Sequence, residues 1–456
     1  MNYLSLRLII PLSLFISASL QGQDLFTSAL SEADNGGILN INGYTRGTIY
    51  GGLDKVDNME IKSGYGEAAL QLSAKPGTMA NAYADIRFKS GIVNGEKLSN
   101  IDIREAYADI YLGRFDLRIG KQIKVWGRAD AFNPTNNLIP EDFFNRSPVQ
   151  DDRRLGNFMI TGRYTPVSFI RLELDWVPFY RNSIYRYDLL DLPEYVFFTE
   201  GELPGGKFGN GSFGAKADFI FSKMEGSLSF FNGYDPMMGL VPGTLPMPPF
   251  DNFEVELLTK EFRQTTYGGD FAVNLGKFGL RGEIAWKITE EDDENIALPM
   301  EELSWAAGID RSVGHVRLLL EYYGKKMIGF QPLDMPPDFD PGLLEDMNNW
   351  PLLAGMMDKQ IGYYNRVLYD QTDEWIHSLL LRPSISILHE TLDIEFTCLY
   401  NFTTGEYMLR PLAKYLLADG IEITAGYEHY YGEKNTRFDW ISNVFSGPFA
   451  EVRISF

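Results

Sequence analysis

The sequence predicts an all-β fold, a transmembrane antiparallel β-barrel of about 18 strands, with 16 as the fallback number. Two observations predict it: long stretches in which apolar and polar residues alternate, and connections that are short and long in turn. Alternation with a period of two places apolar side chains on one face of a strand and polar side chains on the other. In such a barrel the apolar face meets lipid and the polar face lines a wet interior.

The clearest stretch is 101–142, which reads IDIREAYADIYLGRFDLRIGKQIKVWGRADAFNPTNNLIPED. Its alternation breaks only at Gly113-Arg114, so we expect an antiparallel hairpin of two long strands followed by a long irregular segment. The same unit recurs along the chain. The expected strands are 38–51, 62–74, 80–90, 101–113, 114–126, 157–166, 169–179, 209–222, 223–234, 263–275, 277–289, 302–312, 314–325, 374–388, 391–403, 405–418, 420–431 and 446–456.

The connections between these strands fall into two alternating sets. The short set is 75–78, 113–114, 165–167, 222–223, 276–277, 312–314, 388–390 and 419–420. The long set is 52–61, 91–100, 127–156, 180–208, 235–262, 290–301, 326–373 and 432–445, and only Thr404-Gly405 is short where a long connection is expected. Outer-membrane barrels have short periplasmic turns and longer extracellular loops, so we expect this topology and no separate folded domain.

A soluble β-protein is the alternative, because alternation alone does not distinguish a face in water from a face in a lumen. Strand length separates the two, since strands of soluble sheets usually have about 5–6 residues and a tilted membrane-spanning strand needs about 9–11. Tyrosine and tryptophan also gather near the strand ends, as at Tyr322-Tyr323 and Trp440, which is typical of interfacial aromatic girdles.

The two ends of the chain carry signals of their own. Residues 1–22 contain Arg7, a short apolar run and small residues, which is typical of a cleaved secretory signal peptide; a transmembrane anchor is the alternative. We expect 23–37 to be a periplasmic leader and 38–456 to be the barrel. At the other end apolar residues alternate up to Phe456, which we interpret as a signal for barrel assembly.

These features together resemble the porin-like barrels of the bacterial outer membrane. The motif RIGKQ at 118–122, then VWG at 125–127 and Asn133-Pro134, more narrowly resembles an outer-membrane barrel family of unknown function. The resemblance implies an outer-membrane location and a channel or export role, and it names no substrate.

Composition excludes several other functions. The formal net charge of −21 argues against nucleic-acid binding. Cys398 is alone, so the chain has neither an internal disulfide nor a cysteine metal cluster. Acid–histidine neighbours such as Asp373 with His377 occur by chance in an acidic chain, and no phosphate loop or nucleophile elbow is found. We therefore expect no enzyme activity, no cofactor and no metal.

Candidate pore-lining residues carry charge on the polar parity of the strands or at the start of the long loop. They are Arg118, Lys124, Arg128, Asp130, Arg171, Glu173, Arg281 and Glu283. The loop after Trp126 is too apolar to be free, so we expect 127–152 to fold inward as a constriction. An outer lid packed on neighbouring loops is the alternative.

The sequence therefore favours a channel for passive or weakly selective passage of small hydrophilic solutes. A substrate-specific export or import barrel that works with partners is the second hypothesis, and a barrel enzyme or adhesion scaffold is the third. Expected partners are outer-membrane lipid and lipopolysaccharide, the barrel assembly machinery and small hydrophilic solutes. The sequence leaves a homo-oligomer open.

Overall fold

The structure is a computed structural model, and it describes residues 39–53, 59–190, 195–243, 254–290, 298–336, 343 and 346–456. The expected signal peptide 1–22 and leader 23–37 lie outside the described residues.

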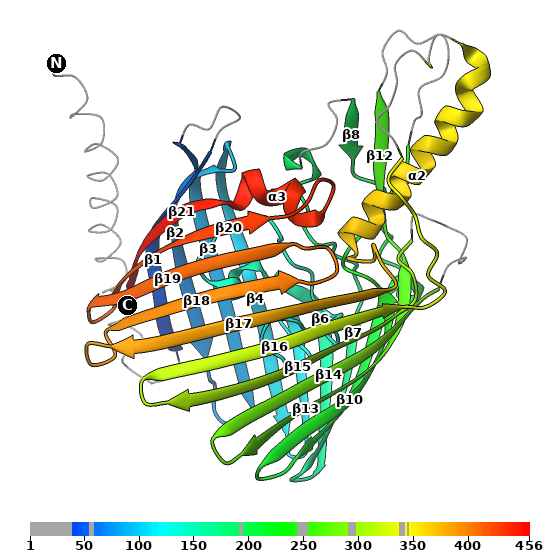
Figure 1. The fold of residues 1–456 in the computed structure, drawn as a ribbon. Helices are drawn as coiled ribbons and strands as arrows, with labels where there is room; N and C mark the ends of the chain where they lie inside the picture. The colour runs from blue at the N-terminus through cyan, green and yellow to red at the C-terminus, as the bar shows by residue number, and fades with distance from the viewer. Residues whose placement is uncertain are drawn as a thin grey trace, which may run out of the picture.

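Eighteen strands of the described residues form one closed antiparallel barrel (Figure 1). Each strand pairs with the next along the chain, and β21 pairs with β1 to close the barrel. The predicted number of strands is confirmed. The barrel strands are β1 (Leu39–Leu53), β2 (Met59–Ala74), β3 (Ala80–Val93), β4 (Glu96–Leu112), β5 (Phe115–Gln122), β6 (Asn157–Val167), β7 (Ile170–Val177), β9 (Ser212–Ile220), β10 (Met224–Tyr234), β13 (Arg263–Leu275), β14 (Phe278–Thr289), β15 (Glu302–Val313), β16 (Val316–Met327), β17 (Trp375–Ile387), β18 (Leu392–Asn401), β19 (Tyr407–Ala418), β20 (Ile421–Tyr431) and β21 (Gly447–Ser455).

Strand β14 shows how the barrel reverses the usual placement of side chains. Ile284 and Trp286 are 48% and 42% exposed on its outer face, whereas the neighbouring carboxylate residue Glu283 is 4% exposed. This is the arrangement that lipid outside and charge inside require. None of the helices in the described ranges is long and apolar enough to cross a membrane.

The connection between β3 and β4 is shorter than predicted. The expected loop 91–100 is wrong, because both strands continue to a turn at Asn94-Gly95. These two residues have φ of +49° and +82°, and an Asn-Gly pair adopts such left-handed angles readily. The β3–β4 hairpin therefore stands at the end of the barrel where the other connections are mostly long.

The long connections fold on one another beyond that end of the barrel (Figure 1). They contribute helices α2 (Trp350–Leu368) and α3 (Arg437–Phe445), three short 3₁₀ helices, and a small sheet of β8 (Val196–Thr199), β11 (Gly239–Pro242) and β12 (Val255–Lys260), all counted within the described residues. A further 3₁₀ helix, η1 (Gln150–Arg153), lies in the connection between β5 and β6 and is anchored to the barrel wall. The shared core of the long connections consists of Phe144, Tyr187, Leu190, Leu240, Val255, Leu257, Met357, Ile361, Tyr364, Val367, Leu368, Trp440 and Phe445.

The side chain of Asn365 joins the helix to the sheet in this unit. Its amide accepts a hydrogen bond of 2.7 Å from the N–H of Leu240 and donates one of 2.8 Å to the carbonyl of Leu240. The side-chain amide thereby pairs with β11 as a neighbouring strand would. We call the whole unit the loop cap.

Candidate functional site

The chain leaves the barrel wall at the end of β5 and enters a long segment that returns to the wall at β6. The wall strand ends at Gln122, whereas the alternation predicted that it would continue to Trp126. The N–H of Ile123 donates to Glu105 at 2.8 Å, and the indole of Trp126 donates to Glu173 at 3.2 Å. Gly127 then turns the chain with φ of +96°. We call residues 123–156 the inward segment.

Glu283 of β14 holds the first part of the inward segment. Its carboxylate accepts hydrogen bonds from the backbone N–H groups of Arg128 and Ala129 at 2.5 and 2.6 Å. It also accepts from the Asn133 amide at 3.1 Å and the Thr135 hydroxyl at 3.0 Å. Four donors of the segment therefore converge on one buried carboxylate, three on Oε1 and one on Oε2.

Glu321 of β16 holds the next residues in the same way. This side chain is completely buried, and it accepts from the backbone N–H groups of Asp130, Ala131 and Phe132 at 2.8, 3.1 and 2.9 Å. The ring of Phe132 stacks on Tyr323 with centroids 4.6 Å apart. Carboxylates that accept several backbone N–H bonds form strong charge-assisted contacts, so these two residues anchor the segment to the wall.

The two charged residues of the predicted constriction also pair with this wall. Arg128 forms ion pairs with Asp270 of β13 and, at 3.2 Å, with Asp218 of β9. Asp130 pairs with Arg281 of β14. Arg128, Asp130, Arg281 and Glu283 are thus brought together in one cluster, in which each charge has a partner of opposite sign or a backbone donor.

The middle of the inward segment packs on the wall near its starting point. Leu138 and Ile139 are buried with Trp126, and this group contacts wall residues of β6, β7 and β10. The wall residues are Met159, Val177 and Phe231. The apolar character that excluded a free loop is accounted for by this contact.

The last part of the segment is anchored to other strands. Asp152 in η1 accepts from Arg46 of β1 and Arg87 of β3, each at 2.8 Å. Burial alone would raise the pKa of Asp152, but the two guanidinium groups hold it below its ordinary value. Arg146 donates to the carbonyl of Phe445 in α3 at 3.2 Å, which connects the segment to the loop cap.

The anchors lie on different sides of the barrel, since β1 and β3 are far from β14 and β16 in the order of strands. A single segment can reach both walls only through the interior. The segment therefore lies inside the barrel, while its residues 143–146 pack into the loop cap.

The remaining predicted site residues are placed apart from this cluster. Arg118 pairs with Asp109 at 2.6 Å, and Lys124 pairs with Glu173 at 2.8 Å and Asp175 at 2.5 Å. Arg171 is exposed on β7. Their role in lining a solute path stays a prediction.

An inner cavity of about 260 Å³ lies between residues 148–150 of the inward segment and the wall. The alternation placed some of its charges on the lumen face, but it gave no reason to single them out. The cavity is lined by Pro148, Val149, Gln150, Arg382, Glu395, Thr397, Met408, Arg410, Leu412, Lys414, Glu422, Thr424 and Glu451.

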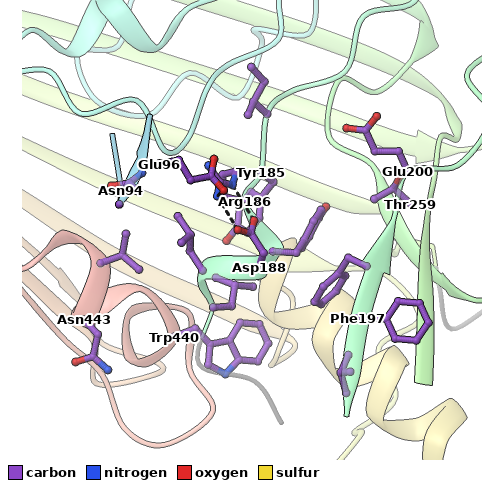
Figure 2. Close-up of a pocket in the computed structure, with 18 of the residues that line it drawn as sticks. Asn94, Glu96, Tyr185, Arg186, Asp188, Phe197, Glu200, Thr259, Trp440 and Asn443 are labelled. Atoms are coloured by element: carbon purple, nitrogen blue, oxygen red, sulfur yellow. Dashed lines mark hydrogen bonds and ion pairs between the residues drawn. The ribbon is translucent and has the colours of Figure 1, made fainter. Parts of the chain in front are cut away.

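A larger pocket of about 1450 Å³ lies among the loops, and Figure 2 shows it. Arg186 pairs there with Glu96 at the β3–β4 turn at 2.9 Å and with Asp188 at 2.6 Å. Phe197 and Glu200 line the pocket from β8 and its following residue. This outer pocket is built by the loop cap and the hairpin together.

Comparison with known proteins identifies the fold. No protein-family model matches the chain, and no curated protein matches it. Among solved structures, OccAB4 of Acinetobacter baumannii is 10% identical, with 92% of this chain and 98% of that chain covered and a TM-score of 0.52.

Two crystal structures from Pseudomonas aeruginosa are similar to the same degree. OccK2 (OpdF) in complex with glucuronate is 10% identical, with 92% and 97% covered and a TM-score of 0.51. The outer membrane protein opdK is 10% identical, with 91% and 97% covered and a TM-score of 0.50. The chain therefore has the same overall fold as these three solved structures, and in this chain the fold is a closed barrel of 18 strands.

Proposed function

We propose that this protein is a porin-like channel that lets small hydrophilic solutes pass across the bacterial outer membrane. The observation that carries the proposal is the inner cavity, which lies inside a barrel with an apolar outer face and is lined mostly by charged and hydroxyl side chains. A polar lumen behind a lipid-facing wall is the arrangement of a water-filled pore. The expected signal peptide and the terminal strand support export to the outer membrane.

The solute path runs along the β17–β21 side of the lumen. On the adjoining wall of β14 and β16, residues 128–135 occupy the interior and are tied to Glu283 and Glu321. We therefore assign Arg128, Asp130, Arg281 and Glu283 to anchoring the constriction, and the walls of the path to Arg382, Glu395, Arg410, Lys414 and Glu422 of the cavity. The inward segment narrows the path from its other side through Pro148–Gln150.

A specific uptake channel is the second candidate. It is favoured by the loop cap and the outer pocket, which place a shaped entrance above the lumen. The fold likeness includes OccK2, whose crystal structure holds glucuronate, a small hydrophilic solute. Both candidates require an open path through the barrel, and they differ in how strongly one solute is preferred.

Conductance of the purified protein in planar bilayers tests the proposal. We expect discrete single-channel currents in potassium chloride, and a protein that inserts as a folded barrel without conducting would contradict it. Lys414→Glu reverses a charge in the cavity and should shift the reversal potential toward cation selectivity. The matched control Lys277→Glu makes the same change in the exposed β13–β14 turn and should leave the reversal potential nearly unaltered.

A further inference from the structure

One pair of oppositely charged side chains in the inner cavity lacks a direct hydrogen bond. Arg382 of β17 and Glu395 of β18 approach only to 4.0 Å between Nε and Oε1, which is too long for a hydrogen bond. The Nε of Arg382 is buried, and among the described residues it has no hydrogen-bond partner. Glu395 accepts one weak bond of 3.3 Å from the Thr397 hydroxyl.

The other basic residues of the cavity are satisfied by the protein. Lys414 pairs with Glu422 at 2.7 Å. Arg410 pairs with Glu428 at 3.1 Å and donates to the carbonyl of Pro148 at 2.7 Å. Buried polar atoms are nearly always hydrogen-bonded, so the buried Nε of Arg382 stands apart from its surroundings. The side chains of Arg382 and Glu395 are 21% and 31% exposed, so both remain accessible from the cavity.

The hydrogen-bonding groups that Arg382 and Glu395 leave free indicate which ligand groups they can bind. A guanidinium with free donors binds a carboxylate in a bidentate manner. A carboxylate with free lone pairs accepts from an ammonium group. The two groups border the same small cavity, and they approach each other only to the outer limit of an ion pair, without a hydrogen bond between them.

Solutes of a single charge match the cavity poorly. The lining places Glu395, Glu422 and Glu451 around an anion. It places Arg382, Arg410 and Lys414 around a cation. Like charges at short range disfavour such a solute. A solute that carries both signs on adjacent atoms is attracted at both ends, and the cavity is below the range of about 300–1,000 Å³ that holds drug-sized ligands.

We propose that the inner cavity is a transit site for small zwitterions, and that a free α-amino acid places its carboxylate on Arg382 and its ammonium group on Glu395. The inference rests on the proposed channel function and names the solute class that this channel prefers. Arg382 and Glu395 are then its specificity-determining residues.

Four three-carbon solutes of similar size test the inference on the full-length channel. They are L-alanine as the zwitterion, L-lactate as the anion, L-alaninol as the cation and propane-1,2-diol as the neutral compound. The measurement is the concentration of each that halves the single-channel potassium chloride current. We expect L-alanine to act at a concentration at least about tenfold lower than the other three, the effect of one added charge-assisted hydrogen bond.

Two charge-neutralising variants separate the roles of the two ends. Arg382→Gln and Glu395→Gln should each raise the half-blocking concentration of L-alanine about tenfold. Heat-modifiable migration in gels verifies that both variants fold, and Lys277→Gln in the exposed turn is the matched control that should behave as the parent chain.

The outcomes are distinguishable. If the parent chain conducts and propane-1,2-diol acts as strongly as L-alanine, the zwitterion site is refuted. Block by L-lactate that depends on Arg382 but not on Glu395 would reveal a site for anions and would also overturn the inference. A folded barrel that carries no current in potassium chloride would instead contradict the proposed channel function.

Discussion

The carboxylate of Glu321 on β16 accepts a hydrogen bond of 2.9 Å from the backbone N–H of Phe132, a residue 189 positions away in the chain. Phe132 lies in the segment that starts at β5, so this bond joins two distant parts of the barrel through its interior. The same carboxylate binds Asp130 and Ala131. Glu321 therefore acts as a fixed acceptor for a turn of backbone that has no regular structure of its own.

Removal of this acceptor should release the first half of the inward segment. Each hydrogen bond to a charged group contributes about 1.5–3 kcal/mol, so Glu321→Ala removes several kcal/mol of local stabilisation and leaves three N–H groups without their acceptor. We expect larger single-channel currents with more noise, while heat-modifiable migration of the barrel persists. Glu321→Gln keeps one acceptor oxygen and should show a smaller effect. Equal currents in all three chains would refute the anchoring role.

Gly127 should be irreplaceable at the point where the chain leaves the wall. Its φ is +96°, and a Cβ there would lie 2.3 Å from Oε1 of Glu283. Gly127→Ala should therefore strain the backbone and displace the Glu283 anchor, with the same increase in current as for Glu321→Ala. Gly405→Ala is the matched control, because Gly405 has φ of +71° but a Cβ added there would meet no neighbouring atom within 4 Å. An unchanged current in the Gly127 variant would show that the anchor tolerates displacement.

The ion pairs of Asp152 predict how the inward segment responds to acid. Since the pKa of Asp152 is below its ordinary value, about 3.9 for a free side chain, its stabilising contribution is complete above that value. The contribution is lost as the pH falls through the lowered pKa of the folded state. We expect the single-channel current to stay constant from neutral pH to about pH 5 and to rise only in stronger acid.

Asp152→Asn should raise the single-channel current at neutral pH, as strong acid is expected to do in the parent chain. It leaves the buried Arg46 and the partly buried Arg87 with one partner fewer, and breaking a buried pair costs about 3–5 kcal/mol. Glu141 is the matched control with the opposite sign, because burial raises its pKa and its protonation therefore favours the folded segment. Glu141→Gln should leave the current at neutral pH at the parent level. A rise of the current between pH 7 and pH 5 in the parent chain would contradict this account.

Phe456 is expected to matter for assembly more than for conduction. Its N–H and carbonyl pair with Gly43 at 2.9 and 3.0 Å, next to the seam between β21 and β1. Phe456→Ala should lower the amount of folded barrel in the outer membrane while the current per channel stays the same. Phe402→Ala is the matched control, since Phe402 is 57% exposed and Phe456 is 56% exposed. Equal folded yields for both variants would remove the assembly interpretation.

The core of the loop cap should protect the long connections from proteases. Phe144 is 3% exposed and contacts Tyr185 and Phe445, so Phe144→Ala should cost about 3–5 kcal/mol locally. On intact cells we expect faster cleavage within 180–208, while the turn at Gly113-Arg114 remains uncut in both chains. Cleavage at Gly113-Arg114 would show that the topology is inverted.

The wall of the barrel was predictable because lipid on one side and charge on the other impose alternation on every strand. The same rule explains the errors. Ile123–Trp126 keep the alternation of β5 although they have left the wall, and Ile123, Val125 and Trp126 all pack in the cluster that includes wall residues. The Asn94-Gly95 turn was a readable hairpin signal that lay inside a polar stretch expected to be a loop.

The loop cap and the anchors were harder to predict for different reasons. In α2, Leu353, Met357 and Ile361 repeat at the helical spacing of four. This spacing indicates a helix within 326–373, a range that was expected to be only a long loop of the barrel. The sequence showed only that Glu283 lies on the polar face of its strand. Its partners are about 150 residues away in the chain, and no local pattern indicates them. The same holds for Arg382 and Glu395, whose significance depends on the groups that surround them.

The position of the inward segment has a consequence for the order in which the protein forms. The segment follows the fifth strand, yet its partners include Glu321, Arg410 and Phe445, which are synthesised far later. Contacts of such long range form late, because a large loop must close before they can exist. We therefore expect the strands to circularise around a segment that is still undocked, so that docking of the inward segment is a late event in the maturation of the barrel.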